Sequence, residues 1–110
     1  MICSLLFILL PFLTFGQNRQ DIDSLKQVIQ TTTKDTTKID ALNDLGWKLM
    51  YSKPDTSIIL SEEALKIAKG IGDKKRIADS YNNLGVYQYL KSNYPKALEY
   101  YFKALEIKKQ

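Results

Sequence analysis

The chain has no histidine and only one cysteine, Cys3. Zinc sites need clustered Cys and His ligands, so the composition excludes them. It also excludes hydrolase centres in which a histidine activates a serine or cysteine nucleophile. Glu62 and Glu63 are adjacent in the sequence, so their side chains point apart on a helix and form no acid–base pair. We therefore predict no catalytic residues, no metal site and no cofactor, in a protein that is not an enzyme.

Glycine and proline are also scarce, with five and three residues, which argues against a loop-rich or disordered chain. The formal net charge is +4, and basic residues cluster at 74–76 and 108–109. These clusters lie near predicted helix ends, and elsewhere basic residues alternate with Asp and Glu. A solvated surface explains this pattern better than a nucleic-acid interface, so we predict no nucleic-acid partner.

Residues 1–16 contain no charged side chain. Residues 5–10 are continuously apolar, and after Pro11 the apolar run resumes with Phe12 and Leu13. This run is too short for a membrane-spanning helix of about 20 residues. It has the length of a signal-peptide core, about 7–15 residues, although the usual positive residue before the core is missing. We predict a signal peptide over residues 1–16 and a secreted or periplasmic location. The alternative is the extracytoplasmic part of an inner-membrane protein.

Two short segments occur twice in the chain. Leu45-Gly46 returns as Leu84-Gly85, and Ala64-Leu65 returns as Ala104-Leu105. The glycines are 39 residues apart and the alanines 40. A fixed period of this size is typical of stacked helical units.

Apolar residues at helical spacing predict helices over residues 21–30, 36–51, 56–69, 74–91 and 94–108. No segment shows the alternation of a strand, so we predict an all-α fold. In the third helix Ile59 is among the residues expected to face inward. We expect Gly70 to be the left-handed C-terminal cap of that helix and Asp73 the N-cap of the next.

The last predicted hairpin follows a pattern of large, small and aromatic positions. Tyr81 and Leu84-Gly85 occupy its first helix, and Ala97, Tyr101 and Ala104 its second. This pattern resembles a tetratricopeptide repeat, with Gln88 and Lys109 as departures from the family's aromatic and closing proline. The preceding hairpin is a looser copy, in which Ser61 replaces the second-helix aromatic and weakens the expectation of tight packing.

The resemblance implies antiparallel helix-turn-helix hairpins stacked as a short superhelix, or α-solenoid. After the signal peptide it divides the chain into an N-terminal flanking helix and linker (17–35), a degenerate first repeat (36–70) and a second repeat (74–110).

Such arrays bind a protein or peptide on the concave face, which is lined by the first helix of each hairpin. The residues that the resemblance places there are Asn43, Trp47, Met50, Tyr51, Asn82, Val86, Tyr89 and Leu90. Asn43 and Trp47 stand where a family member that clamps a carboxylate would need Lys and Asn, so we do not expect that clamp.

The C-terminal helix would leave an apolar face open at Leu98, Phe102 and Ile107. We expect that face to self-associate or to pack against further repeats. A signal sequence followed by degenerate repeats is similar to the extracytoplasmic regions of bacterial sensor histidine kinases and related regulators. The alternative function is therefore the N-terminal sensory region of a membrane-bound signalling protein.

Overall fold

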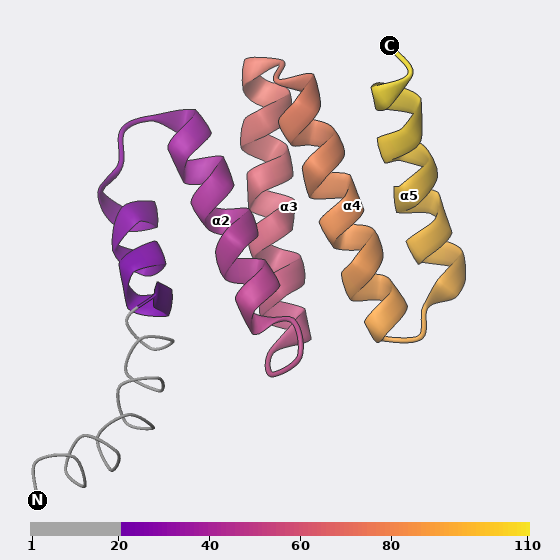
Figure 1. The fold of residues 1–110 in the computed structure, drawn as a ribbon, viewed down its shortest axis with the longest axis horizontal. Helices are drawn as coiled ribbons and strands as arrows, with labels where there is room; N and C mark the ends of the chain where they lie inside the picture. The colour runs from indigo at the N-terminus through magenta and orange to yellow at the C-terminus, as the bar shows by residue number, and fades with distance from the viewer. Residues whose placement is uncertain (1–20) are drawn as a thin grey trace, which may run out of the picture.

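The computed structural model describes residues 21–110, and these residues form helices without any strand (Figure 1). A helix over residues 21–31 comes first. It is followed by α2 (Asp35–Leu49), α3 (Pro54–Ile71), α4 (Lys74–Leu90) and α5 (Tyr94–Lys108). Consecutive helices run in opposite directions and follow one another across the molecule in chain order. This arrangement confirms the predicted all-α array of helical hairpins. The predicted signal peptide lies outside the described residues.

The turn between α3 and α4 lies two residues later than predicted. Gly70 is inside α3, and Gly72 takes the left-handed conformation, with φ 67°. The amide of Asp73 donates to the carbonyl of Ala68, as in a Schellman C-cap. The Asp73 side chain then accepts a hydrogen bond from the Arg76 amide and caps α4, which confirms its predicted role. The prediction for Gly70 was wrong because α3 continues through Ile71, so Gly72 takes the left-handed position at its end.

The buried stripe of α3 consists of small residues: Ser57, Ser61, Ala64 and Ala68. Residues three and four positions apart share one side of a helix, so this stripe faces α2 along its whole length. Ile59 was predicted to face inward but is 64% exposed, because it lies on the opposite side of α3 from the stripe. Leu60 and Ile67 pack at the edge of the core.

Two apolar clusters hold the array together. In the first, Ile39 and Leu42 of α2 meet Ala64 and Ala68 of α3, with Ile29 of the first helix against them. In the second, Ala78 and Tyr81 of α4 meet Ala104 of α5, and Leu65 of α3 packs against them. Each cluster therefore takes a side chain from the neighbouring hairpin or flanking helix.

A glycine in the first helix of each hairpin lets an aromatic ring approach the backbone closely. A Cβ atom at Gly85 would lie 2.5 Å from the ring of Tyr101, which comes from α5. A Cβ atom at Gly46 would lie 3.0 Å from the hydroxyl of Tyr87, which comes from α4. Tyr87 is fully buried and occupies the space next to Ser61, so the first hairpin is tightly packed despite its missing aromatic.

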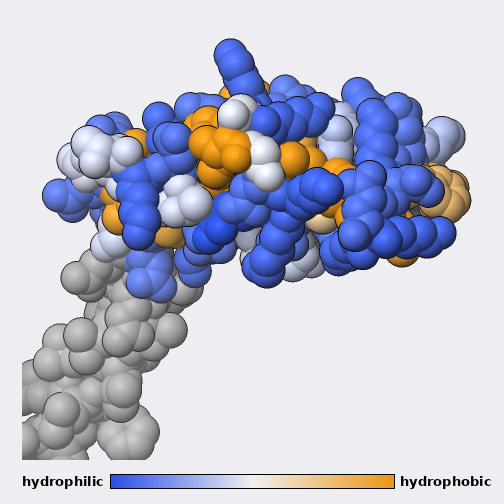
Figure 2. Space-filling model, turned by 90° about the horizontal axis from the view of Figure 1, so that it is seen from above, coloured by the Kyte–Doolittle hydropathy of each residue, from blue (hydrophilic) through white to orange (hydrophobic). Residues whose placement is uncertain are grey.

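The outer face of α5 carries exposed apolar side chains. Leu98, Phe102 and Leu105 are all exposed, Phe102 to 62%. Ile107 was expected to share this face, but it packs against the cluster around Tyr81 instead. Figure 2 shows one face of the molecule, which is largely hydrophilic, with hydrophobic residues near its middle and at the end where α5 lies.

Candidate functional site

The eight residues expected to bind a partner lie on or just beyond two neighbouring helices. Asn43 and Trp47 belong to α2, and Met50 and Tyr51 follow its last residue. The other four, Asn82, Val86, Tyr89 and Leu90, belong to α4. Because α2 and α4 contact each other, the structure brings the two sets onto adjoining helices.

Four of these side chains are exposed: Trp47, Tyr51, Tyr89 and Leu90. Asn82 and Val86, which precede Tyr89 on α4, are half-buried. Trp47 is 47% exposed, which is unusual for the largest apolar side chain. The Tyr89 ring stacks obliquely on Tyr94 of α5, with 5.3 Å between ring centroids. We call the six exposed or half-buried residues the α2–α4 surface.

Asn43 and Met50 are buried and do not contribute to this surface. The Asn43 Oδ1 atom accepts a hydrogen bond of 2.9 Å from the Ser61 hydroxyl. Its Nδ2 atom donates to the Ser80 hydroxyl at 3.0 Å. Asn43 therefore joins α2 to α3 and α4 at once, and its amide group is used inside the protein. A buried amide without such partners would be costly, so this network favours one alignment of the helices.

Arg76 forms a second polar connection between α2 and α4. Its guanidinium group donates two hydrogen bonds to the Asp40 carboxylate, at 2.9 and 2.8 Å. A third hydrogen bond, of 2.8 Å, goes to the Asp73 carboxylate. The hydrogen bonds from Arg76 hold the pKa of Asp73 below its usual value, and those to both carboxylates raise the pKa of Arg76. A bidentate Arg–carboxylate contact fixes the relative orientation of the two side chains and also pairs their charges.

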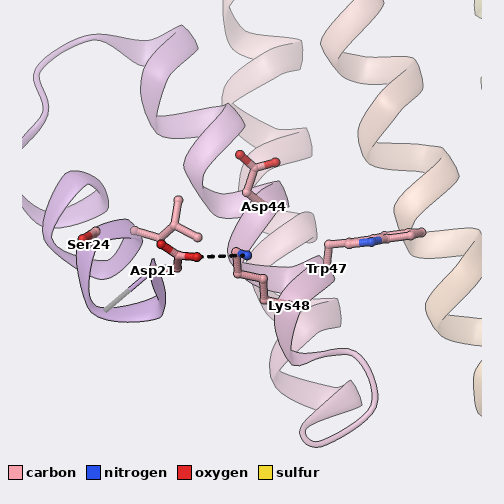
Figure 3. Close-up of a pocket in the computed structure, with 6 residues that line it drawn as sticks. Asp21, Ser24, Asp44, Trp47 and Lys48 are labelled. Atoms are coloured by element: carbon pink, nitrogen blue, oxygen red, sulfur yellow. Dashed lines mark ion pairs between the residues drawn. The ribbon is translucent and has the colours of Figure 1, made fainter. Parts of the chain in front are cut away.

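Beside the α2–α4 surface lies an open cleft of about 430 Å³ between the first helix and α2 (Figure 3). It is lined by Asp21, Ser24, Leu25, Asp44, Trp47 and Lys48. Lys48 and Asp21 face each other across the cleft, with 3.9 Å between Nζ and Oδ2. Trp47 lines the edge nearest α4, and Figure 3 shows its indole directed from α2 toward α4. The cleft and the α2–α4 surface are thus continuous through this side chain.

The Asp44 carboxylate makes no ion pair or side-chain hydrogen bond within residues 21–110. Partial burial raises the pKa of Asp44, the negative charge of Asp40 adds to the rise, and Lys48 opposes it. The Asp44 carboxylate therefore has no direct cationic contact within these residues, although the charge of Lys48 acts on it from a distance.

Asp44, Lys48 and Asp21 were not among the predicted site residues. Asp44 stands three residues before Trp47, so the two side chains lie on the same side of α2. This helical spacing was the signal that could have identified Asp44. Asp21 could not be linked to this site from the sequence, because the packing of the flanking helix against α2 is a tertiary contact.

Among the described residues, no three Cys, Asp or Glu side chains are grouped closely enough to hold a metal ion. None of the helices over residues 21–110 is long and apolar enough to cross a membrane.

The tetratricopeptide repeat family matches the chain over residues 52–110. No curated protein and no solved structure shows a significant match. The matched residues include α3, α4 and α5, together with the close contact of Gly85 and Tyr101, and amount to just over half of the chain. The family is a non-catalytic repeat module that generally mediates interactions between proteins. The chain belongs to the tetratricopeptide repeat family.

Proposed function

We propose that this protein binds an extended segment of another protein on the α2–α4 surface and carries out no catalysis itself. The supporting observation is the exposure of Trp47 and Tyr89 on two helices that contact each other. Aromatic side chains offer large contact areas at a low cost in conformational entropy, and they are enriched at binding sites. The polar contacts of Asn43 and Arg76 fix the two helices, so the surface needs little rearrangement to bind.

Selection from a library of random 12-residue peptides tests this proposal. The full chain is immobilised, bound peptides are selected, and their affinity is measured by fluorescence anisotropy. Replacing Trp47, Tyr51 and Tyr89 together by alanine should weaken binding at least tenfold, because truncating buried interface aromatics has that effect. Circular dichroism should show unchanged helix content, since all three side chains are exposed.

The matched control replaces Ile59 and Phe102 by alanine. These residues are also exposed and apolar, but they lie on α3 and α5 rather than on the α2–α4 surface. The control variant should bind the selected peptides as the wild type does. An equal loss of peptide affinity in both variants, or no loss in the triple variant, would contradict binding on the α2–α4 surface.

We also propose that the protein works outside the cytoplasm. The uncharged segment over residues 1–16 supports this proposal, because it has the apolar core expected of a signal peptide. Alkaline phosphatase fused after residue 110 is active only if the fusion protein is exported. Phosphatase activity in intact cells would support the proposal, and a fusion protein that stays inactive in the cytoplasm would refute it. The sensory region of a membrane-bound histidine kinase or regulator is the alternative. A kinase or DNA-binding segment encoded in frame beyond codon 110 would decide for that alternative.

The outer face of α5 supports a further contact, with a second copy or with another repeat. In the described chain, the equivalent face of α3 is covered by α4. Analytical ultracentrifugation of the wild type and of the Phe102→Ser variant would test self-association. A wild type that stays monomeric at high concentration would leave packing against another repeat as the role of this face.

A further inference from the structure

We infer that the segment bound by this protein inserts an arginine or lysine side chain into the cleft between the first helix and α2. This inference rests on the proposed function, because the cleft opens onto the α2–α4 surface through Trp47. It goes further by naming the chemistry of the ligand.

The charge of the cleft is opposite to that of the whole chain. The chain has a formal net charge of +4, but the cleft contains the carboxylates of Asp21 and Asp44 and the single cation Lys48. The ion pair of Lys48 with Asp21 spans 3.9 Å between two exposed side chains, so it is weak and easily rearranged. Asp44 has no cationic partner within the described residues. The cleft is therefore complementary to one additional positive charge.

The lining of the cleft also suits a long side chain with an apolar stem. Leu25 provides apolar surface beside the carboxylates, and Trp47 lines the edge of the cleft toward α4. Lysine and arginine bury their methylene groups along such surfaces while their charged ends reach polar partners. The volume of about 430 Å³ accommodates one such side chain together with the adjoining backbone.

Other ligand types fit the cleft less well. An acidic or phosphorylated side chain would be repelled by Asp44 and Asp21. An apolar side chain would cover the Asp44 carboxylate without providing a partner, and desolvating an unpaired charge is costly. Asp44 is exposed, so an apolar ligand would remove the water that solvates its carboxylate. A cation instead restores favourable interactions for that carboxylate.

The test uses the 12-residue library on three forms of the full chain: wild type, Asp44→Asn and Glu62→Gln. Asp44→Asn removes the charge and keeps the shape of the side chain. Glu62→Gln is the matched control, because Glu62 is an exposed carboxylate on α3, outside the cleft. Peptides selected by the wild type and by Glu62→Gln should be enriched in arginine and lysine. Peptides selected by Asp44→Asn should show no such enrichment.

The tightest arginine-containing peptide is then compared with its citrulline analogue, which has the same shape without the charge. Replacing arginine by citrulline should weaken binding to the wild type about fivefold, which is the effect of one solvent-accessible ion pair. The same replacement should have no effect on binding to Asp44→Asn. Trp47 is the only tryptophan of the chain, so its fluorescence reports occupancy beside the cleft directly.

The outcomes separate the two proposals. Peptides that bind through Trp47 and Tyr89 but show no preference for a cation, or keep that preference in Asp44→Asn, would overturn the inference and leave the proposed function standing. A library that yields no peptide dependent on the α2–α4 surface would overturn both. Enrichment in arginine and lysine that disappears only in Asp44→Asn would support both.

Discussion

The outer faces of α3 and α5 occupy equivalent places in their hairpins but have different surroundings. Leu65 of α3 packs against the cluster of Ala78, Tyr81 and Ala104. Leu105, forty residues later, is 48% exposed. The difference comes from α4, which covers α3 and has no counterpart over α5 within the described residues. Whether the leucine at this repeated position is buried thus depends on the presence of the next helix and not on the sequence of the repeat itself.

The two hairpins also obtain their central aromatic residue from different helices. In the second hairpin Tyr101 of α5 packs on Gly85 of the same hairpin. In the first hairpin Tyr87 reaches back from α4 to Gly46, next to Ser61. The first hairpin therefore takes the aromatic residue at its glycine from the second hairpin, whereas the second hairpin supplies its own.

The largest effect expected from this comparison is that of Tyr87→Ala. Emptying the site of a fully buried aromatic side chain should lower the free energy of unfolding by about 3–5 kcal/mol. Because Tyr87 fills the first hairpin from the second, hydrogen exchange should accelerate in α2 and α3 as well as in α4. Chemical denaturation followed by circular dichroism measures the first effect, and exchange mass spectrometry the second.

Two variants sharpen that test. Tyr87→Phe keeps the ring and removes a buried hydroxyl without a hydrogen-bond partner, so stability should be unchanged or raised by about 1 kcal/mol. Tyr101→Ala should cost less than Tyr87→Ala, because Tyr101 is only partly buried. Equal losses for the two alanine variants, confined to their own helices, would contradict the dependence of the first hairpin on the second.

The next effect contrasts the covered and the open leucine. Leu65→Ala should lower the free energy of unfolding by about 2 kcal/mol, because it removes packing against α4. Leu105→Ala should change it by less than about 0.5 kcal/mol, as is usual for an exposed side chain. Thermal or urea unfolding at low protein concentration gives both values. A large loss for Leu105→Ala that grows with protein concentration would show that α5 is covered by another copy in solution.

A smaller effect separates the two glycines. At Gly85 an added methyl group would meet the Tyr101 ring at 2.5 Å, and overpacking of this kind costs about 1–3 kcal/mol. At Gly46 the nearest atom is 3.0 Å away, so the gain in helix propensity of about 1 kcal/mol should offset most of the strain. We expect Gly85→Ala to destabilise the protein clearly and Gly46→Ala to be nearly neutral. The reverse order in urea unfolding would contradict the packing described for the two hairpins.

The sequence predicted the helices well because their signals are local. Capping by Asp73 and the apolar period of each helix depend on neighbouring residues only. The source of the aromatic at Gly46 could not be predicted, because Tyr87 reaches it across the boundary between two hairpins. Ile59 was misplaced for a related reason: the small residues Ser57 and Ser61 turned out to form the buried stripe of α3.

The candidate site was predictable only in part. The resemblance to a tetratricopeptide repeat placed Trp47 and Tyr89 on the partner-binding face, and both are exposed on α2 and α4. It placed Asn43 on the same face, but Asn43 is buried and forms hydrogen bonds with Ser61 and Ser80. Spacing shows which side of a helix a residue occupies, whereas the hydrogen-bonding groups opposite that residue decide whether it stays accessible.

The smallest effect concerns the two turns that follow α3 and α4. Gly72 and Ser92 both have left-handed φ angles, 67° and 64°. Asn93 donates to the Gln88 carbonyl after Ser92, just as Asp73 donates to Ala68 after Gly72. A serine in this conformation costs about 1 kcal/mol relative to glycine, because its Cβ atom crowds the following carbonyl oxygen. Ser92→Gly should therefore raise the midpoint of thermal unfolding, and Gly72→Ser should lower it by a similar amount. If Ser92→Gly left the midpoint unchanged, the flexibility it adds to the unfolded chain would have to cancel the relief of strain.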